Sequence, residues 1–333
     1  MTTIRDVARH ASVAPMTVSR VINQPETVAP ETRRRVELSI EALHYVPNLL
    51  GQGLRFKRTM VIALVVSDIS NPFAIKQILG ASNAARDQGF NVIFAHTSAS
   101  PTEELAQLRS LVERRVDGVV LSPVLNTPDT TDFLQKQGLP VTIMDYPMPE
   151  NDVDTVRCDS ISAARGLTEH LLALGHSRIA MISGPESIVT ARERADGYAK
   201  AMRASKLEPL VVFSDYSPEG GYRVAHELLS ASTRPTGLVT ANNFIALGAG
   251  RAAIDLGLTI PDDLSIATFD SLSPDSVLDP FFTGVVQPVE AIASRATTML
   301  IERIRGEYTG AGRDVVLPST LEIHSSTASA PPL

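Results

Sequence analysis

Polar side chains end several of the most apolar runs in the chain. Asp145 closes the run VTIMD and Asp270 closes SIATFD, while Asn242 follows GLVTA and Gln287 follows TGVV. A carboxylate or an amide can bridge two neighbouring hydroxyl groups. If these runs are strands of open parallel sheets, their ends lie where such sheets bind ligands. The four side chains therefore predict a polar binding site.

Three further residues could complete this site. Arg194, near the start of a predicted helix, offers a guanidinium that can also bridge two hydroxyls. Asn71 and Phe73 follow the first apolar run of the body, and an aromatic face can cover the apolar side of a sugar ring. Structural alternatives stay open: Asn71 or Asp270 could only cap or turn the chain beyond its strand. Arg194 could only pair with an acid, and Phe73 could only pack in a wall.

The N-terminal segment carries a charge opposite to that of the rest. Residues 1–60 contain nine Lys and Arg against five Asp and Glu, although the formal net charge of the whole chain is -7. A basic head on an acidic body suggests that the head binds a polyanion.

Apolar residues in this head recur at helical spacing. They predict three short helices: one over 4–11, one from Pro15, and one from Pro30 to about Leu43. Two helices about four residues apart outline a helix-turn-helix unit, whose second helix enters the major groove of DNA. A small helical bundle without a nucleic acid partner is the alternative.

The body, from about residue 60, alternates short apolar runs with longer amphipathic stretches. The runs are MVIALVVS, FNVIFAH, VDGVVLSP, LPVTIMD, RIAMISG, TGLVTAN and LSIATFD. This alternation predicts βα units around parallel sheets that are covered on both faces. Two sets of units, separated near residues 155–160, predict two similar lobes with a ligand cleft between them.

The sequence gives little support for an enzyme or for an exported protein. The run LGAGRAA imitates a dinucleotide-binding fingerprint, but its glycines fall inside a predicted helix and do not follow a strand directly. No nucleophile elbow, P-loop or metal-ligand spacing occurs, so we expect no catalytic residue, no metal and no cofactor. The single cysteine, Cys158, excludes an internal disulfide and fits a reducing cytoplasm. The N-terminus lacks an apolar signal region, which argues against an exported solute-binding protein.

The head and the body both resemble the LacI/GalR family of bacterial transcription regulators. In the head the resemblance lies in TIRDVARHASV, MTVSRVIN, ETRRRVELSIEALHYVPN and the Leu54 that follows. In the body it lies in DISNPF, ARDQGF, RRVDGVVLSP, EHLLALGHSRIAMISG, RERADGY, GLTIPDDLSIATFD and FFTGVVQPV. It covers roughly residues 3–327.

This resemblance implies an all-α helix-turn-helix head plus an α/β body, whose two Rossmann-like lobes resemble a periplasmic sugar-binding protein. The implied domains are a DNA-binding domain at 1–46, a hinge helix or linker at 47–58, and an effector-binding and dimerisation core at 59–333. Lobe one would comprise about 59–157 and 288–317, and lobe two about 158–287 and 318–328.

The implied function is that of a cytoplasmic transcription regulator and not an enzyme. It would repress carbohydrate-utilisation genes, bind a pseudo-palindromic operator as a homodimer, and be relieved by a sugar or sugar derivative. No membrane partner is expected. The identity of the effector, the operator sequence, and whether the effector releases or enforces DNA binding stay open.

The resemblance also implies two sets of site residues. DNA would be contacted by Thr3, Pro15, Met16, Thr17, Arg20, Asn23, Thr32, Asn48 and Leu54. The effector would be contacted by Asn71, Phe73, Asp145, Arg194, Asn242, Asp270 and Gln287.

The chain departs from the family pattern at several of these sites. Ala14 and Ala29 stand where relatives cap two head helices with Ser, and Asn243 stands where relatives usually carry Asp. Gly51 and Gly53 occupy the hinge, where Leu54 would wedge into the minor groove. Each glycine disfavours a helix by roughly 0.5–1 kcal/mol relative to alanine. We therefore expect the hinge to be helical only on operator DNA.

Overall fold

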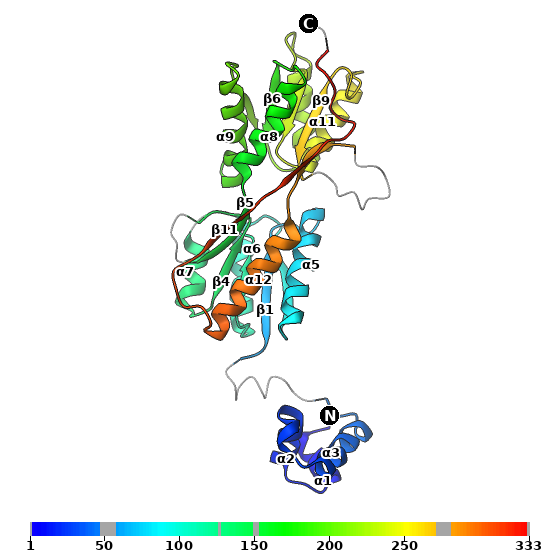
Figure 1. The fold of residues 1–333 in the computed structure, drawn as a ribbon, viewed down its shortest axis with the longest axis vertical. Coiled ribbons are helices and arrows are strands. Elements are labelled where there is room, and N and C mark those ends of the chain that lie inside the picture. Colours follow the sequence, from blue (N-terminus) through cyan, green and yellow to red (C-terminus); the bar gives the residue numbers. More distant parts are fainter. Residues whose placement is uncertain (1, 47–57, 126–127, 149–152, 271–280, 332–333) are drawn as a thin grey trace. The chain divides into compact units, whose positions relative to one another are not determined.

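The computed structural model describes residues 2–46, 58–125, 128–148, 153–270 and 281–331 (Figure 1). The chain divides into two compact units, Met1–Thr59 and Met60–Leu333. The hinge expectations for Asn48, Gly51, Gly53 and Leu54 lie outside the described residues.

The first unit contains the three predicted helices: α1 (Ile4–His10), α2 (Pro15–Asn23) and α3 (Pro30–Ala42), with a short 3-10 turn at Pro25–Thr27. Their apolar stripes form one small core. Its buried members are Val7, Ala8, Ala11, Val18, Val21 and Val36.

Capping differs among these helices. Thr3 and Asp6 form a capping box on α1, in which each side chain accepts a hydrogen bond from the other residue's backbone N–H. Ala14 and Ala29 precede α2 and α3 without a side-chain cap, and a proline opens each helix. Proline suits that position because its fixed φ matches the helix and its missing donor would be unpaired anyway.

The second unit contains two six-stranded sheets. The first is wholly parallel, with the strand order β11-β5-β4-β3-β1-β2. Its strands are β1 (Val61–Val66), β2 (Asn91–His96), β3 (Val119–Leu121), β4 (Val141–Met144), β5 (Asp154–Cys158) and β11 (Asp314–Leu317). Its helices are α5 (Pro72–Asp87), α6 (Pro101–Glu113), α7 (Pro128–Lys136) and α12 (Val289–Arg305).

Both faces of the central strands of this sheet are buried. On β1, Ile62, Leu64 and Val66 join the core beneath α5 and α12, whereas Ala63 and Val65 join the core beneath α6 and α7. Successive strand residues point to opposite faces, so a strand covered on both sides must be apolar throughout. This explains why the sequence of β1 is an unbroken apolar run, the pattern from which a buried strand was expected.

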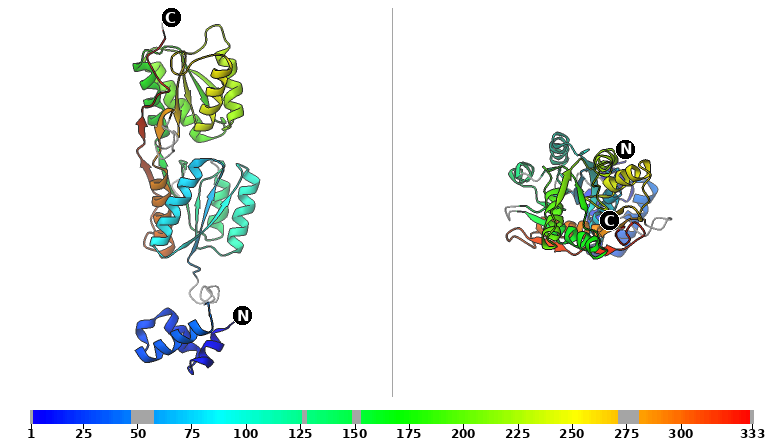
Figure 2. Two further views of the ribbon diagram at one scale, coloured as in Figure 1. Left: turned by 90° about the vertical axis from the view of Figure 1, so that its right-hand side faces the viewer. Right: turned by 90° about the horizontal axis from the view of Figure 1, so that it is seen from above.

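The second sheet repeats this order as β12-β10-β9-β8-β6-β7, with only β12 antiparallel. Its strands are β6 (Ile179–Ser183), β7 (Leu210–Phe213), β8 (Gly237–Thr240), β9 (Ser265–Phe269), β10 (Thr283–Val286) and β12 (Thr320–Glu322). Its helices are α8 (Ser160–Ala173), α9 (Val189–Ala204), α10 (Pro218–Leu229) and α11 (Asn243–Asp255). The predicted fold class is confirmed, and the chain passes between the sheets after β5, after β10 and after β11 (Figures 1 and 2).

The run LGAGRAA lies within α11, as predicted. A Cβ atom added at Gly248 would lie 2.0 Å from the carbonyl oxygen of Pro218, so this glycine lets α10 and α11 pack closely. Its role is packing, which removes the dinucleotide-binding interpretation. Cys158 is buried. His176 is buried too, and its ring nitrogens form hydrogen bonds with Thr236 Oγ1 at 2.9 Å and with Ser265 Oγ at 3.1 Å, so its role is structural.

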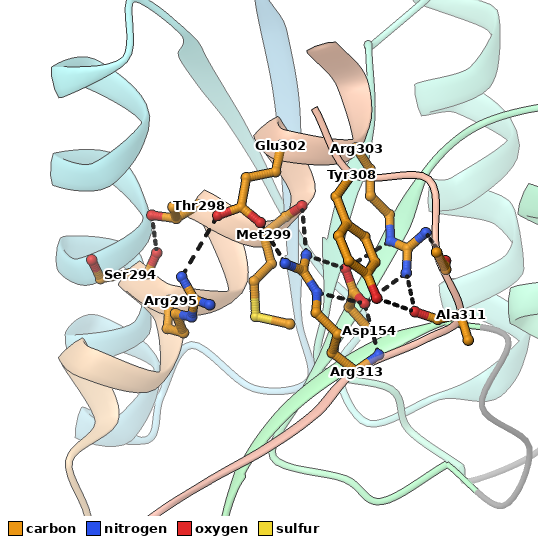
Figure 3. A network of polar contacts seen from close by, with 11 residues as sticks. Asp154, Ser294, Arg295, Thr298, Met299, Glu302, Arg303, Tyr308, Ala311 and Arg313 are labelled. Carbon is orange, nitrogen blue, oxygen red and sulfur yellow. Dashed lines mark hydrogen bonds and ion pairs between the residues drawn. The ribbon is translucent and has the colours of Figure 1, made fainter. Parts of the chain in front are cut away.

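One buried ion-pair network ties the end of α12 to the start of β5 (Figure 3). Asp154 is fully buried and accepts two hydrogen bonds of 2.7 Å from the guanidinium of Arg303. Arg313 donates to the same carboxylate at 2.8 Å and also pairs with Glu302. The ring of Tyr308 lies 4.9 Å from the guanidinium carbon of Arg303 and 3.9 Å from that of Arg313. Burial alone would raise the pKa of Asp154, but the two guanidinium groups outweigh it and lower that pKa to about 2.

We predict that Asp154→Asn lowers the free energy of unfolding by about 2 kcal/mol at neutral pH, as the pKa shift from 3.8 to about 2 implies. A depressed carboxyl pKa contributes stability that is complete above the unfolded pKa. That contribution is lost as the pH falls through the folded pKa. The difference between wild type and variant, measured by urea unfolding, should therefore shrink as the pH falls from about 4 towards 2.

The matched control is Asp132→Asn, because Asp132 forms only an exposed pair with Lys136 at 4.0 Å. It should change stability by less than about 0.5 kcal/mol at any pH. Equal effects of the two changes at neutral pH would contradict a stabilising role for the network.

Candidate functional site

The two sheets border a cleft of about 630 Å³. Its walls come largely from the loops and helix starts that follow the carboxyl ends of the strands, where open parallel sheets bind ligands. The structure brings together around this cleft all seven residues that the sequence suggested for an effector. They are Asn71, Phe73, Asp145, Arg194, Asn242, Asp270 and Gln287.

The two carboxylates occupy equivalent places in the two lobes. Asp145 directly follows β4, Asp270 directly follows β9, and these strands have the same rank in their sheets. Both residues have a left-handed backbone, with φ of 70° and 57°. Asp tolerates this conformation better than most residues, yet it remains costly and is concentrated at functional sites.

Each carboxylate has an amide partner. Gln77 of α5 donates to Asp145, and Gln287 Nε2 donates to Asp270 Oδ1 at 2.6 Å. The guanidinium of Arg194 lies beside Asp270, with Nη1 3.9 Å from Oδ2. A glutamine can satisfy a carboxylate without neutralising its charge. The opposing positive charge comes from Arg194 for both acids, and for Asp270 also from Lys76.

Arg194 is held from several sides. It is 7% exposed, its Nη1 donates to the carbonyl oxygen of Ala241, and its guanidinium carbon lies 4.2 Å from the centre of the Phe269 ring. The sequence left open whether Arg194 only pairs with an acid. It does pair with Asp270, and it also lines the cleft.

Burial and mutual repulsion shape the charge of the cleft. Burial, and next the negative charge of Asp270, raise the pKa of Asp145 to about 7 against the hydrogen bond from Gln77 and the charge of Arg194. Burial also raises the pKa of Asp270, although Arg194 and Gln287 oppose the shift. The cleft thus disfavours the charged forms of Asp145 and Asp270.

Three buried polar atoms at the cleft have no hydrogen-bond partner among the described residues. They are Asp145 Oδ1, Arg194 Nε and Tyr216 Oη. Buried polar groups in native proteins are nearly always paired, so an unpaired set at a cleft suggests that a ligand completes it.

Two of the predicted residues also cap helices. Asn71 Oδ1 accepts from the backbone N–H of Phe73 at 3.0 Å at the start of α5, and Asn242 Oδ1 accepts from that of Ile245 at 2.9 Å at the start of α11. Asn71 therefore caps a helix, as one alternative held, but it also lines the cleft, and the amide nitrogen of each residue takes no part in the cap. Asn243, where the family usually carries Asp, is buried and its Oδ1 has no partner among the described residues.

Sequence reasoning missed several cleft residues. Gln77 lies one helical turn after Phe73 on α5, a spacing that places both on one helix face. Tyr146 directly follows Asp145, and Tyr216 follows the short edge strand β7. The turn sequence SDYSPEG after that strand was the available signal for Tyr216.

In the head, the predicted DNA-contacting residues lie mostly on the outer surface of α2. Pro15 and Arg20 are exposed, Met16 is 56% exposed, and Thr17 is half-buried. Asn23, at the end of α2, donates to the carbonyl oxygen of Ser19 at 2.6 Å.

The other two described residues of this set lie on neighbouring helices. Thr3 caps α1, and its hydroxyl donates to Asp6 at 2.6 Å. Thr32 is half-buried in the first turn of α3.

Comparison with known proteins accounts for both parts of the chain. Residues 3–48 match the family described as bacterial regulatory proteins, lacI family. Residues 59–324 match the family of periplasmic binding proteins and sugar-binding domains of the LacI family. The chain belongs to the LacI family. It is a DNA-binding transcription regulator, and the resemblance noted in its sequence is confirmed.

Relatives of this LacI-family chain are similar over nearly their full length. Catabolite control protein A of Priestia megaterium is 32% identical over 98% of this chain and 99% of its own. The ribose operon repressor of Halalkalibacterium halodurans is 33% identical over 91% of each.

Solved structures of the family have a fold similar to that of this chain. A complex of the transcriptional regulator CelR with cellobiose has a TM-score of 0.74 and 31% identity, covering 98% of this chain and 100% of that one. The lac repressor dimer bound to operator and an anti-inducer has a TM-score of 0.87 and 26% identity, covering 98% and 99%.

The described residues offer neither a membrane-spanning helix nor a cluster of metal ligands. None of the helices among them is long and apolar enough to cross a membrane. No group of three or more His, Cys, Asp or Glu side chains in that part of the chain could hold a metal ion.

We predict that the two roles of Asn242 can be separated. Asn242→Ala removes the cap of α11 and should lower the free energy of unfolding by about 1 kcal/mol. Asn242→Ser keeps a capping oxygen and should recover most of that loss, while still lacking the amide nitrogen at the cleft. Urea unfolding of the three proteins measures both effects, and equal stability of the Ala and Ser variants would show that the cap contributes nothing.

Proposed function

We propose that this LacI-family chain is a homodimeric repressor whose affinity for operator DNA is controlled by a sugar or sugar derivative bound in the cleft. The observation that carries the proposal is the cleft itself. Seven polar or aromatic side chains from both lobes converge on it, in a chain that also carries a helix-turn-helix head. The repressor would act in the cytoplasm, where the chromosome lies, and would catalyse no reaction.

The chemistry of the cleft supports a hydroxylated ligand. Carboxylate, amide and guanidinium groups each bridge neighbouring hydroxyls, and the rings of Phe73, Tyr146 and Tyr216 offer apolar faces. Relatives point the same way, because one is named a ribose operon repressor and one structure contains cellobiose.

An exposed apolar surface on the first lobe supports dimerisation. Ile75 and Leu79 of α5 are 54% and 48% exposed, and lie one helical turn apart. On the edge strand β2, Phe94 is 48% exposed and lies on the face that α5 covers, because Val92, two residues earlier, packs in the core beneath α5 and α12. Contiguous exposed apolar side chains mark protein contacts, and a two-fold dimer would present two heads to a pseudo-palindrome. The lac repressor structure is a dimer on its operator.

The head would read DNA with the first turns of α2. Arg20 can donate two hydrogen bonds to a guanine edge, and Met16 can only make apolar contact, as with a thymine methyl. The surrounding arginines would contact phosphates, which supply sequence-independent affinity.

The position of the ligand suggests how control works. A ligand bridging Asp145 of one lobe and Asp270 of the other binds best in one arrangement of the two lobes, so it shifts the population towards that arrangement. We expect the arrangement favoured by the effector to release the operator.

The proposal is tested by selecting a duplex from a random pool with the full-length protein and titrating it in fluorescence anisotropy with and without sugars. Tight binding of a palindromic duplex, weakened by at least one sugar, is expected. Failure to select any preferred sequence would contradict the proposal.

We predict that Arg20→Ala relaxes base preference at one position of each half-site, at a cost of about 1–3 kcal/mol for the preferred base. The measurement compares affinity for the selected duplex with affinity for duplexes changed at single positions. Uniform weakening on all sequences would identify Arg20 as a phosphate contact instead.

A further prediction concerns the cleft. Asp270→Ala or Arg194→Ala should abolish the effector response and leave operator affinity unchanged, because the head is a separate unit. Anisotropy with the selected duplex measures both. Asp262→Ala, which removes an exposed acid beyond the opposite end of β9, is the control and should respond normally. A normal response in the two cleft variants would remove these residues from the site.

A further inference from the structure

The cleft contains more acidic than basic side chains. Among the residues that the structure describes, four carboxylates line it, from Asp68, Asp145, Asp215 and Asp270, against the single guanidinium of Arg194. Asp68 and Asp215 accept hydrogen bonds from the hydroxyls of nearby serines, which leave their charge in place. Among the described residues, only Asp270 of these four acids forms an ion pair, and its partner is Arg194.

The charge of Arg194 is therefore already shared. Its Nη1 lies 3.9 Å from Oδ2 of Asp270, and the side chains of Arg194 and Asp270 are only 9% and 13% exposed. Asp145 lies in the same cleft without a cation of its own, and burial together with the charge of Asp270 already raises its pKa. A ligand that brought another negative charge would face two buried carboxylates and one guanidinium that is already paired.

The unpartnered atoms specify a ligand with both donors and acceptors. Asp145 Oδ1 accepts when ionised, Arg194 Nε only donates, and Tyr216 Oη can do either. An alcohol supplies a donor and an acceptor on one oxygen, so neighbouring hydroxyls can satisfy all three atoms. A phosphate ester or a carboxylate supplies acceptors, which suit Arg194 but repel Asp145.

An aromatic wall fits the same kind of ligand. The ring of Tyr216 packs directly on Gly184, where an added Cβ atom would lie 2.1 Å from Cζ. This close approach fixes the ring of Tyr216 in the cleft lining. The ring offers an apolar face, whereas other parts of the lining carry carboxylates. Ring faces attract the C–H groups of a sugar ring, so the wall favours a sugar, and the carboxylates decide which charge that sugar can carry.

We infer that the effector of this cleft is an uncharged sugar or polyol, and that Asp145 and Asp270 together exclude phosphorylated and carboxylated sugars. The inference rests on the proposed function of the cleft and adds the charge of the ligand. It names the chemical class, and the individual sugar remains to be found by the experiment.

The experiment uses the full-length protein and matched pairs of compounds. D-ribose is compared with D-ribose 5-phosphate, D-glucose with D-glucose 6-phosphate and with D-gluconate, in a panel that also holds other pentoses, hexoses, polyols and cellobiose. Thermal unfolding finds the compounds that bind, and titration calorimetry measures their affinities. At least one neutral compound should bind, and its anionic counterpart should bind at least roughly 100-fold more weakly.

A variant without the charge of Asp145 tests whether this carboxylate causes the preference for neutral sugars. Asp145→Asn keeps the size of the side chain and, well above the pKa of about 7, removes one negative charge. The affinities of both proteins are therefore compared at about pH 8.5, where the preference for the neutral member of a pair should shrink by at least roughly tenfold. Asp262→Asn removes the same charge beyond the opposite end of β9 and should leave the preference unchanged. Cooperative thermal unfolding of both variants, close to that of the wild type, shows that their lobes are folded.

Two results would overturn the inference. One is equal or tighter binding of an anionic sugar than of its neutral counterpart, and the other is binding of no neutral compound in the panel. An anionic sugar that binds and changes operator affinity would leave the proposed regulation standing and refute only the charge assignment. If no compound of either charge changes operator affinity, the proposed function itself fails.

Discussion

Two carboxylates that share one guanidinium inside a cleft are the constraint on which the rest of this structure depends. Asp145 and Asp270 must be held close to Arg194 although burial and their mutual repulsion disfavour the charged forms. Holding them there costs free energy, which the packed sheets on either side must supply. The cleft is consequently prepared for a ligand whose hydroxyls replace the water that the carboxylates have lost, and this preparation is what makes binding selective.

The duplicated fold explains why the carboxylates meet. The two sheets have the same strand order, and the strands β4 and β9, which precede Asp145 and Asp270, have the same rank in their sheets. Two lobes that face each other across their carboxyl edges bring equivalent positions together, so a residue type favoured at one edge is repeated at the other. A ligand held between them contacts both lobes at once, and any change in its occupancy is felt by both. Under the proposed function, a small molecule regulates the chain by favouring one arrangement of these two lobes.

Much of this could be predicted from the sequence, and what could not has physical reasons. Strands buried on both faces read as unbroken apolar runs, so the polar residue ending each run, such as Asp145 or Asn242, was visible. Tyr216 was missed because β7 is a short, partly exposed edge strand with a weak pattern. The network around Asp154 joins it to Arg303, 149 residues away, and no local pattern encodes such a pair.

The central claim is that sugar binding in the cleft and operator binding by the head are thermodynamically coupled. The reciprocity of such coupling tests this claim most directly. The affinity of a cleft-binding sugar is measured by calorimetry for the free protein and for the protein saturated with its selected duplex. If the claim is correct, the duplex weakens sugar binding by the same factor by which the sugar weakens duplex binding. Equal sugar affinities in the presence and absence of the duplex would contradict it, because a ligand that binds both states equally cannot shift their populations.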